Sequence, residues 1–228
     1  MSKSGSEKIP SANELTDIYH KLFSCYGNQQ WWPADDREEV IIGAILTQNT
    51  NWLNVTRALQ NLKKNNLCSL HKLASASKAT ISELIKPSGY YNLKADRLQN
   101  CAHFLKDWQP ASLTFEEARR YLLAIKGIGP ETADSILLYA FHIPVFVIDT
   151  YTIRLLNRFF CISSGKNYSY YQSLFMNQLT KESDLYNEYH ALIVQHCKSF
   201  CRRKPLCDNC PINSECLYHL SNRKKQSD

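Results

Sequence analysis

Apolar residues recur three or four positions apart along most of this chain, which is the spacing that gives a helix one hydrophobic face. Leu15, Ile18, Leu22 and Tyr26 show this spacing first, and similar series continue as far as Phe159. The one β-rich run, at 144–148, is short and leads directly into Asp149. The pattern therefore predicts an all-α fold with short connections.

Proline and glycine clusters mark the points where the predicted helices end. They are Trp31-Trp32-Pro33, the segment 86–89, Gln109-Pro110, and the segment 127–130. The two ends of the chain, roughly before Ala12 and after His219, are polar. We expect both of these ends to be disordered.

The composition narrows the class of protein only partly. The chain has 228 residues and 44% of them are hydrophobic, so it can bury a core without disulfides. Its net charge of +6 fits nucleic-acid binding and ordinary solubility equally well. No apolar run is long enough to span a membrane, and the N-terminus lacks the apolar core of a signal peptide. We therefore expect a cytoplasmic protein with no membrane partner.

Cysteines are concentrated near the C-terminus, where five of the nine lie between residues 197 and 216. Because thiols stay reduced inside cells, this clustering indicates a metal site and not disulfides. Cys201, Cys207, Cys210 and Cys216 have the spacing C-x5-C-x2-C-x5-C. Four thiolates can hold a [4Fe–4S] cluster or a Zn²⁺ ion, and on spacing alone zinc is the commoner ion.

The segment 121–151 contains a tight turn between two predicted helices. Gly127 and Gly129 flank Ile128, and Pro130 follows where a proline favours the start of a helix. The glycines allow backbone conformations that other residues avoid and leave room for another molecule's backbone. N–H groups of such a turn can hold DNA phosphates without reading base sequence. A plain helical connector is the alternative, since a G-x-G turn alone is weak evidence.

Four segments, in the same order, resemble the endonuclease III superfamily of helix-hairpin-helix DNA glycosylases. They are LTQNT at 46–50, SGYYNLKADRL at 88–98, the hairpin followed by Asp149, and the cysteine cluster. The resemblance covers the chain from about residue 12 to residue 216. It implies two helical domains flanking a DNA-binding cleft, namely a six-helix domain at 29–143 and a discontinuous cluster domain formed by 1–28 and 144–228.

The resemblance also implies roles for single residues. Asp149, at the mouth of the cleft, would stabilise the positive charge that develops on the sugar during base excision. An aspartate before a helix is also a common N-cap, and the two roles are compatible. Gln48 would fill the hole left by a flipped base. The turn Gly127–Gly129 would hold the DNA backbone.

The cysteine loop of this superfamily is C-x6-C-x2-C-x5-C around an iron–sulfur cluster. The resemblance therefore favours [4Fe–4S] over zinc as the cofactor, with Cys201, Cys207, Cys210 and Cys216 as ligands. The first gap is one residue shorter here, so Cys197 stays open as an alternative first ligand.

In endonuclease III the strand-cleaving lysine lies two residues after the second glycine of the hairpin. In this sequence that position holds Glu131. Because a glutamate cannot form a Schiff base, we expect a monofunctional enzyme that leaves the DNA strand intact. The sequence looks most similar to the third type of bacterial 3-methyladenine DNA glycosylase. That likeness implies that Trp31, Trp32 and Pro33 line the base pocket, where aromatic faces would stack on a cationic methylated purine.

The expected partner is double-stranded DNA with a damaged base, bound by a monomer in the nucleoid of a bacterial cell. Two other functions stay open. One is an endonuclease III-like glycosylase that acts on oxidised or mismatched bases, and the other is a non-catalytic helix-hairpin-helix DNA-binding protein. A zinc-stabilised scaffold would leave the hairpin and the Gln48 segment unexplained.

Arg202, Arg203 and Lys204 lie between the first two cysteines of the cluster, where the ligands would fix their arrangement. We predict that they contact DNA phosphates. Replacing all three by alanine should flatten the dependence of log Kd on log salt concentration, because fewer counterions are released on binding. An unchanged slope would show that the three cations only keep the loop solvated.

Overall fold

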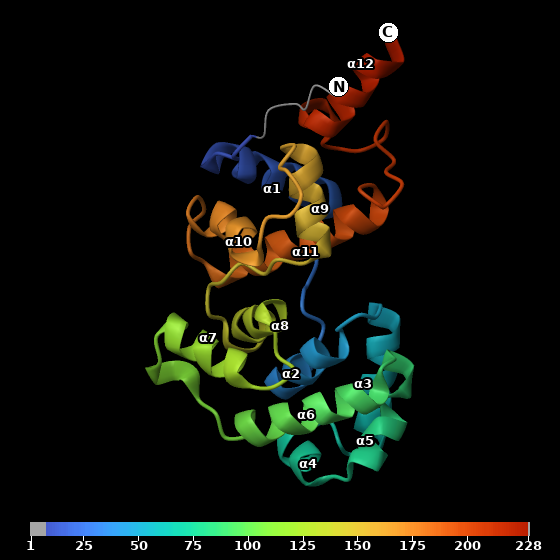
Figure 1. Ribbon diagram of the computed structural model, residues 1–228, viewed down its shortest axis with the longest axis vertical. Coiled ribbons are helices and arrows are strands. Elements are labelled where there is room, and N and C mark those ends of the chain that lie inside the picture. Colours follow the sequence, from blue (N-terminus) through green and yellow to red (C-terminus); the bar gives the residue numbers. More distant parts are fainter. Residues whose placement is uncertain (1–7, 228) are drawn as a thin grey trace. The chain divides into compact units, whose positions relative to one another are not determined.

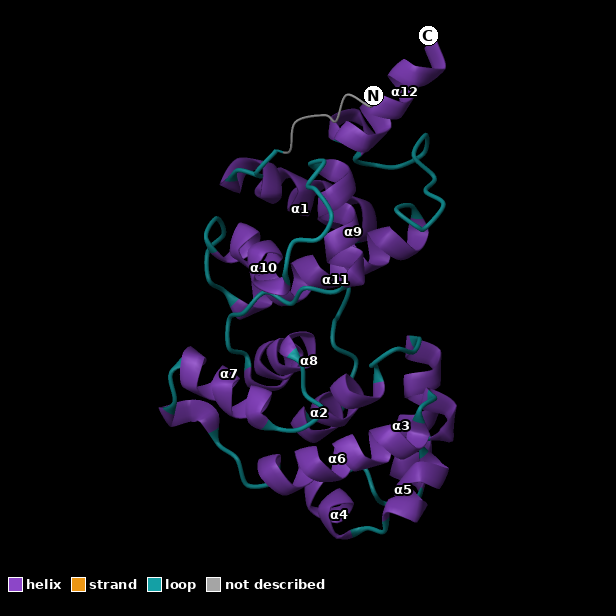
Figure 2. Ribbon diagram, viewed as in Figure 1, coloured by secondary structure: helices purple, strands orange, loops and turns teal. Residues whose placement is uncertain are grey.

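The computed structural model describes residues 8–227, the last four by their backbone alone. All regular secondary structure in this range is helical, which confirms the all-α prediction (Figure 2). The run at 145–148 is buried and forms no strand. The expectation of disorder after His219 is wrong, because the last helix continues to Ser227. For residues 1–7 that expectation lies outside the described part of the chain.

Two compact units make up the structure, one formed by residues up to Trp31 together with those from Pro144, the other by Trp32–Ile143. The elements of the first unit are α1 (Ala12–Tyr26), α9 (Thr150–Phe159), α10 (Tyr168–Met176), α11 (Ser183–Ser199), η4 (Asn213–Glu215) and α12 (Leu217–Ser227). Those of the second are α2 (Arg37–Leu46), α3 (Trp52–Lys64), α4 (Leu70–Ser75), α5 (Lys78–Leu84), η1 (Lys86–Ser88), α6 (Tyr91–Leu105), η2 (Pro110–Ser112), α7 (Phe115–Ala124), α8 (Pro130–Ser135) and η3 (Ile136–Ala140) (Figure 1). None of the described helices is long and apolar enough to cross a membrane.

Helix α2 forms the centre of the second unit. Every residue from Glu39 to Leu46 is buried, as expected for a helix that is apolar on all sides. It packs against α3, α6, α8 and η3. Helix α8 runs directly into η3, a five-residue π-helical turn whose residues are all buried.

The core of the first unit is built on α11, which packs against α1 and α9. The Tyr189 hydroxyl donates a hydrogen bond to the Leu15 carbonyl of α1 at 2.8 Å. Phe146, from the extended run before α9, stacks on Phe175 with ring centroids 3.8 Å apart. The β-rich run therefore supplies core side chains to this unit and positions the residue directly after it, Asp149.

Side-chain caps precede seven of the twelve described α-helices. In each, an oxygen of the residue before the helix accepts the N–H three residues later, which satisfies a group that has no partner within the helix. The capping residues are Ser11, Asp36, Asn51, Ser77, Thr114, Asp149 and Asn167.

Candidate active site and nucleic-acid interface

The predicted hairpin turn lies between α7 and α8. Gly127 has φ +99, a conformation that favours glycine, so the expectation for this residue is confirmed. The corresponding expectation for Gly129 is wrong, because its φ of −97 and ψ of 178 suit any residue. A Cβ on Gly129 would meet nothing within 4 Å, so the turn is open on that side. The side chain of Ile128 is buried and its N–H donates to the Ile125 carbonyl at 3.0 Å.

A buried ion pair joins the two helices of the hairpin. Arg119 of α7 donates through Nε and Nη2 to the two oxygens of Asp134 of α8, at 2.6 and 3.1 Å. Asp134 is fully buried. A two-point contact of this kind fixes distance and orientation together, so the turn between the helices is held from both sides.

Gln48 lies just beyond α2 and points at the hairpin. Its Nε2 donates to the Gly127 carbonyl at 3.1 Å and to Thr132 Oγ1 at 3.0 Å. Its Oε1 accepts a hydrogen bond from Arg97 of α6. The amide is thus engaged with the turn itself, an arrangement that the sequence did not reveal.

Glu131 is exposed in the first turn of α8, directly after Pro130. An acidic residue is favourable there because the N-terminal end of a helix carries partial positive charge. Lys126, the nearest lysine in sequence, is also exposed and precedes the turn.

Trp32 belongs to an aromatic wall that it forms with Trp52 and Tyr139. Its ring meets the ring of Trp52 edge-on with centroids 5.0 Å apart, and its centroid lies 5.2 Å from that of Tyr139. Gly43 of α2 lets the Trp32 indole pack closely, since a Cβ there would lie 3.3 Å from the ring. Trp31 is half-buried and Pro33 is exposed.

Asp149 is the N-cap of α9, as the sequence suggested. Its Oδ1 accepts the Thr152 N–H at 2.7 Å, and its Oδ2 lies 3.7 Å from Nε2 of His190 on α11. The carboxylate is 12% exposed and the imidazole 7% exposed. Each oxygen of the carboxylate therefore faces a different polar group, which fixes its orientation.

These neighbours keep the Asp149 carboxylate ionised. Burial alone would raise the pKa of this carboxyl, because it disfavours the charged form. The His190 imidazole and the Thr152 N–H outweigh that effect and hold the pKa below its ordinary value. The site thus contains a fixed negative charge at neutral pH.

The four cysteines Cys201, Cys207, Cys210 and Cys216 line one cavity of the first unit. Cys197 does not line it, and its thiol donates to the Tyr151 carbonyl at 3.4 Å. Two polar side chains face the sulfurs from the cavity wall. Arg158 Nη1 donates to Cys201 Sγ at 3.3 Å, and His196 Nε2 lies 3.6 Å from Cys210 Sγ. Within the described residues, no three His, Cys, Asp or Glu side chains are placed to hold a single metal ion.

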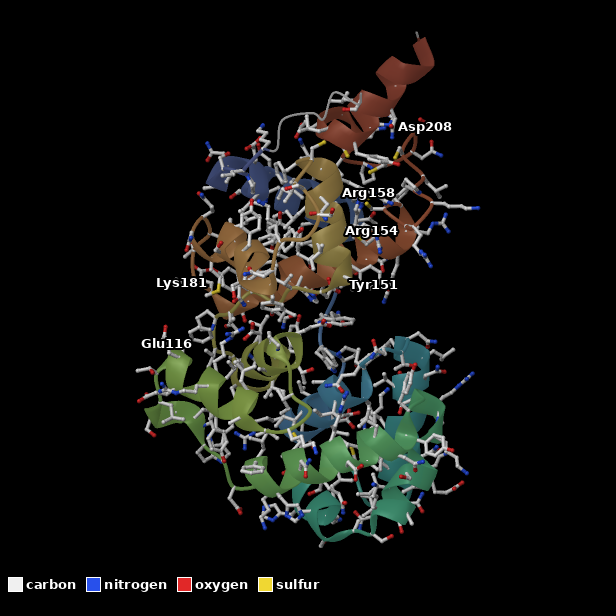
Figure 3. All side chains as sticks on the ribbon, in the orientation of Figure 1. Glu116, Tyr151, Arg154, Arg158, Lys181 and Asp208 are labelled. Carbon is white, nitrogen blue, oxygen red and sulfur yellow. The ribbon has the colours of Figure 1, made fainter. Side chains whose placement is uncertain are left out.

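The basic loop 202–204 is held by its backbone and exposes its side chains. Arg158 donates to the carbonyls of Arg202 and Arg203 at 2.6 and 3.1 Å, while Arg154 Nε donates to the Cys201 carbonyl at 2.7 Å. Both Arg154 and Arg158 extend from α9 toward the cysteine loop, on which Asp208 is labelled (Figure 3). The helix that Asp149 caps therefore also anchors this loop.

Sequence reasoning missed the partners that complete these sites. His190 lies far from Asp149 in sequence, and Trp52 and Tyr139 lie far from Trp32. A histidine or tyrosine on an apolar helical face looks like an ordinary core residue, so no local signal marked them. Trp52 had one local signal. It is the first residue of α3, and it follows Asn51, which caps that helix and comes directly after the polar LTQNT segment.

Comparison with known proteins gives a consistent result. Residues 42–181 match the family model of the HhH-GPD superfamily of base excision DNA repair proteins. A Methanocaldococcus jannaschii protein, provisionally named a DNA repair glycosylase, is 47% identical over 88% of this chain and 94% of its own length. Endonuclease III of Sulfolobus acidocaldarius is 32% identical over 81% of this chain and 83% of its own. The solved structure of H. pylori 3-methyladenine DNA glycosylase (MagIII) bound to 1,N6-ethenoadenine is similar with a TM-score of 0.68, at 30% identity, over 83% of this chain and 98% of that one.

The effect of His190 on the pKa of the Asp149 carboxyl can be tested without an activity assay. His190→Phe removes one of the two groups that offset burial and leaves the Thr152 N–H, so the pKa of the Asp149 carboxyl should rise above that of the wild type. Carbon-13 NMR titration of labelled aspartate carboxyls measures this shift directly. His103→Phe, at an exposed position on α6, is the matched control and should leave the titration unchanged. An identical Asp149 titration in His190→Phe would mean that the helix N-terminus alone sets the charge.

Proposed function

The chain belongs to the HhH-GPD superfamily of base excision DNA repair proteins, and on that premise we propose that it is a monofunctional glycosylase for alkylated purines such as 3-methyladenine. The observation that carries the proposal is the fixed, ionised carboxylate of Asp149 at the start of α9. The likeness to the H. pylori 3-methyladenine enzyme, at 30% identity, supports the choice of substrate.

Asp149 is the proposed catalytic residue. Cleavage of the N-glycosidic bond develops positive charge on the sugar, and a carboxylate held in place stabilises it without having to reorganise. The Thr152 N–H fixes one oxygen of Asp149, and the other, which faces His190, is the one we assign to orienting the attacking water. A 3-methylated adenine is already cationic, so its departure needs no acid from the protein.

Trp31, Trp32 and Pro33 are proposed to line the pocket for the flipped base. The aromatic wall gives a physical basis for this role, because Trp52 and Tyr139 hold the Trp32 indole in one orientation. A rigid aromatic face stacks on an electron-poor cationic ring with a gain of about 1 kcal/mol or more when water is excluded. Gly43 permits the close packing on which that rigidity depends.

The enzyme is proposed to stop after hydrolysis. Glu131 occupies the position at which a lyase needs an amine, and its carboxylate suits the first turn of α8. The turn Gly127–Gly129 would hold the DNA backbone through its main chain, and its open side at Gly129 leaves room for that contact. Arg202, Arg203 and Lys204 would add phosphate contacts from a loop whose backbone is fixed by Arg158.

We also propose a [4Fe–4S] cluster held by Cys201, Cys207, Cys210 and Cys216. The donor set fits, because these four thiols line one cavity and two of them face a hydrogen-bonding side chain. Such second-layer contacts orient ligands and stabilise thiolate charge. When bound, the cluster would hold the cysteine loop in one conformation and would take no part in the reaction at Asp149. Zinc stays the alternative on the spacing of the cysteines, but a single ion would need at least three described ligands to move closer together.

One other substrate class has support from the comparisons. The 32% identity to an endonuclease III over most of both chains is compatible with oxidised or mismatched bases as targets. A purely DNA-binding role has less support, because it gives the buried Asp149–His190 pair no function.

The substrate proposal is tested with methylated duplex DNA, following released bases and strand breaks separately. We expect free 3-methyladenine, with breaks appearing only after alkali. Asp149→Asn should lower the rate of release by about 100-fold or more while keeping the helix cap, since asparagine caps as well as aspartate. Asp107→Asn, at an exposed carboxylate, is the control. If no purine is released from this DNA, but bases are released from duplexes that contain oxidised or mismatched bases, the substrate belongs to the endonuclease III class. Breaks without alkali would contradict the role given to Glu131.

The cofactor proposal is tested by iron, sulfide and zinc analysis of the purified protein together with its visible spectrum. We expect a brown protein with thiolate-to-iron charge-transfer absorption. Cys201→Ala should lose iron and colour, whereas Cys197→Ala should keep both because its thiol is directed to the Tyr151 carbonyl. A colourless protein that contains zinc would establish the alternative metal, and the reverse order of the two variants would make Cys197 the ligand.

A further inference from the structure

The run 145–148 leads the chain into Asp149, and every one of its residues is buried. Buried backbone N–H and C=O groups need hydrogen-bond partners, which a neighbouring strand often supplies. This run forms no strand. Side chains must therefore do part of what a strand would do, and those side chains decide where the backbone before Asp149 lies.

Helix α10 provides two such side chains. Gln172 Nε2 donates to the Phe146 carbonyl at 2.8 Å, and the Ile148 N–H donates to the Tyr168 hydroxyl oxygen at 3.3 Å. Tyr168 and Gln172 are four residues apart and so share one face of the helix. Gln172 is itself buried, so its contact with Phe146 is shielded from water.

The same helix contacts the chain on both sides of Asp149. Phe175 stacks on Phe146, with ring centroids 3.8 Å apart and planes within 5° of parallel. The Tyr171 hydroxyl donates to Asn157 Oδ1 of α9 at 2.7 Å. Helix α10 therefore holds the run before Asp149 and the helix after it, and Asp149 lies at their junction.

From these contacts we infer that Gln172 and Tyr168 are positioning residues for the reaction at Asp149. Thr152 and His190 set the orientation of the carboxylate, whereas Gln172 and Tyr168 set the place of the backbone that carries it. Neither residue has to touch the DNA to do this. The inference rests on the catalytic role proposed for Asp149 and holds for any base that the enzyme excises.

Gln172→Met tests the role of the amide, because methionine keeps an unbranched side chain and cannot donate to the Phe146 carbonyl. A catalytic group displaced by about 1 Å can lower a rate by about 100-fold. At saturating protein, the single-turnover rate constant of base release should fall by about tenfold or more. The Kd for undamaged duplex should stay the same, because the buried Gln172 does not reach DNA. Gln178→Met, at an exposed position just after α10, is the matched control and should keep the wild-type rate.

Tyr168→Phe is the second variant, in case Gln172→Met does not fold. It removes the oxygen that accepts the Ile148 N–H and keeps the ring. We expect a smaller loss of rate in the same direction. Without DNA, the Ile148 N–H should exchange faster than in the wild type. The carbon-13 resonance of the Asp149 carboxyl should shift in both variants, a change that a loss of stability alone would not produce.

Two outcomes would overturn the inference. One is a wild-type rate constant in both variants. The other is a loss of rate while the Asp149 resonance and the exchange of the Ile148 N–H stay as in the wild type. Failure of the proposed function has a different sign, because Asp149→Asn would then release bases as fast as the wild type.

Discussion

A helix ends with backbone groups that have no partner inside it, and a protein made of short helices has many such ends. Here side chains satisfy those groups at the positions to which function is assigned. Lys94 donates to carbonyls at the end of α2 and in η1, and Asp149 accepts an N–H of the first turn of α9. The hydrogen bonds that complete the helices are thus the ones that orient the candidate site. At these residues the same hydrogen bonds complete a helix and orient a side chain or loop of the candidate site.

Helix α9 shows how far this coupling extends within the first unit. Asp149 caps its N-terminus, and its later turns carry Arg154 and Arg158, which donate hydrogen bonds to carbonyls of the cysteine loop. One stiff element therefore fixes both the carboxylate and the loop that contains the thiols. His190 of α11 faces Asp149 from the other side, while His196 of the same helix faces Cys210. Two packed helices thus connect the two candidate sites of this unit.

The sequence predicted the features that depend on neighbours along the chain. The all-α class, the turn at Gly127, the helix start at Pro130 and the cap at Asp149 follow from periodicity and from local backbone preferences. The partners of the site residues were not predicted, because they come from distant segments. Arg97 over Gly127 and His190 beside Asp149 depend on how helices pack, which no local pattern encodes. The prediction of an unusual backbone conformation at Gly129 was wrong for a related reason. A glycine can keep the space around it open and still adopt an ordinary conformation.

The π-helical turn η3 makes the aromatic wall depend on the number of residues in this one turn. A π-helical turn holds about one residue more than an α-helical turn, so it is equivalent to an α-helix with a single-residue insertion. Removing that residue would keep the helix but rotate the later side chains about its axis by about 100°. Tyr139, which lies in this turn, would then leave the Trp32 ring. One codon gained or lost can therefore open or close one side of the wall, and related enzymes should be aligned here by the number of residues as well as by their identity.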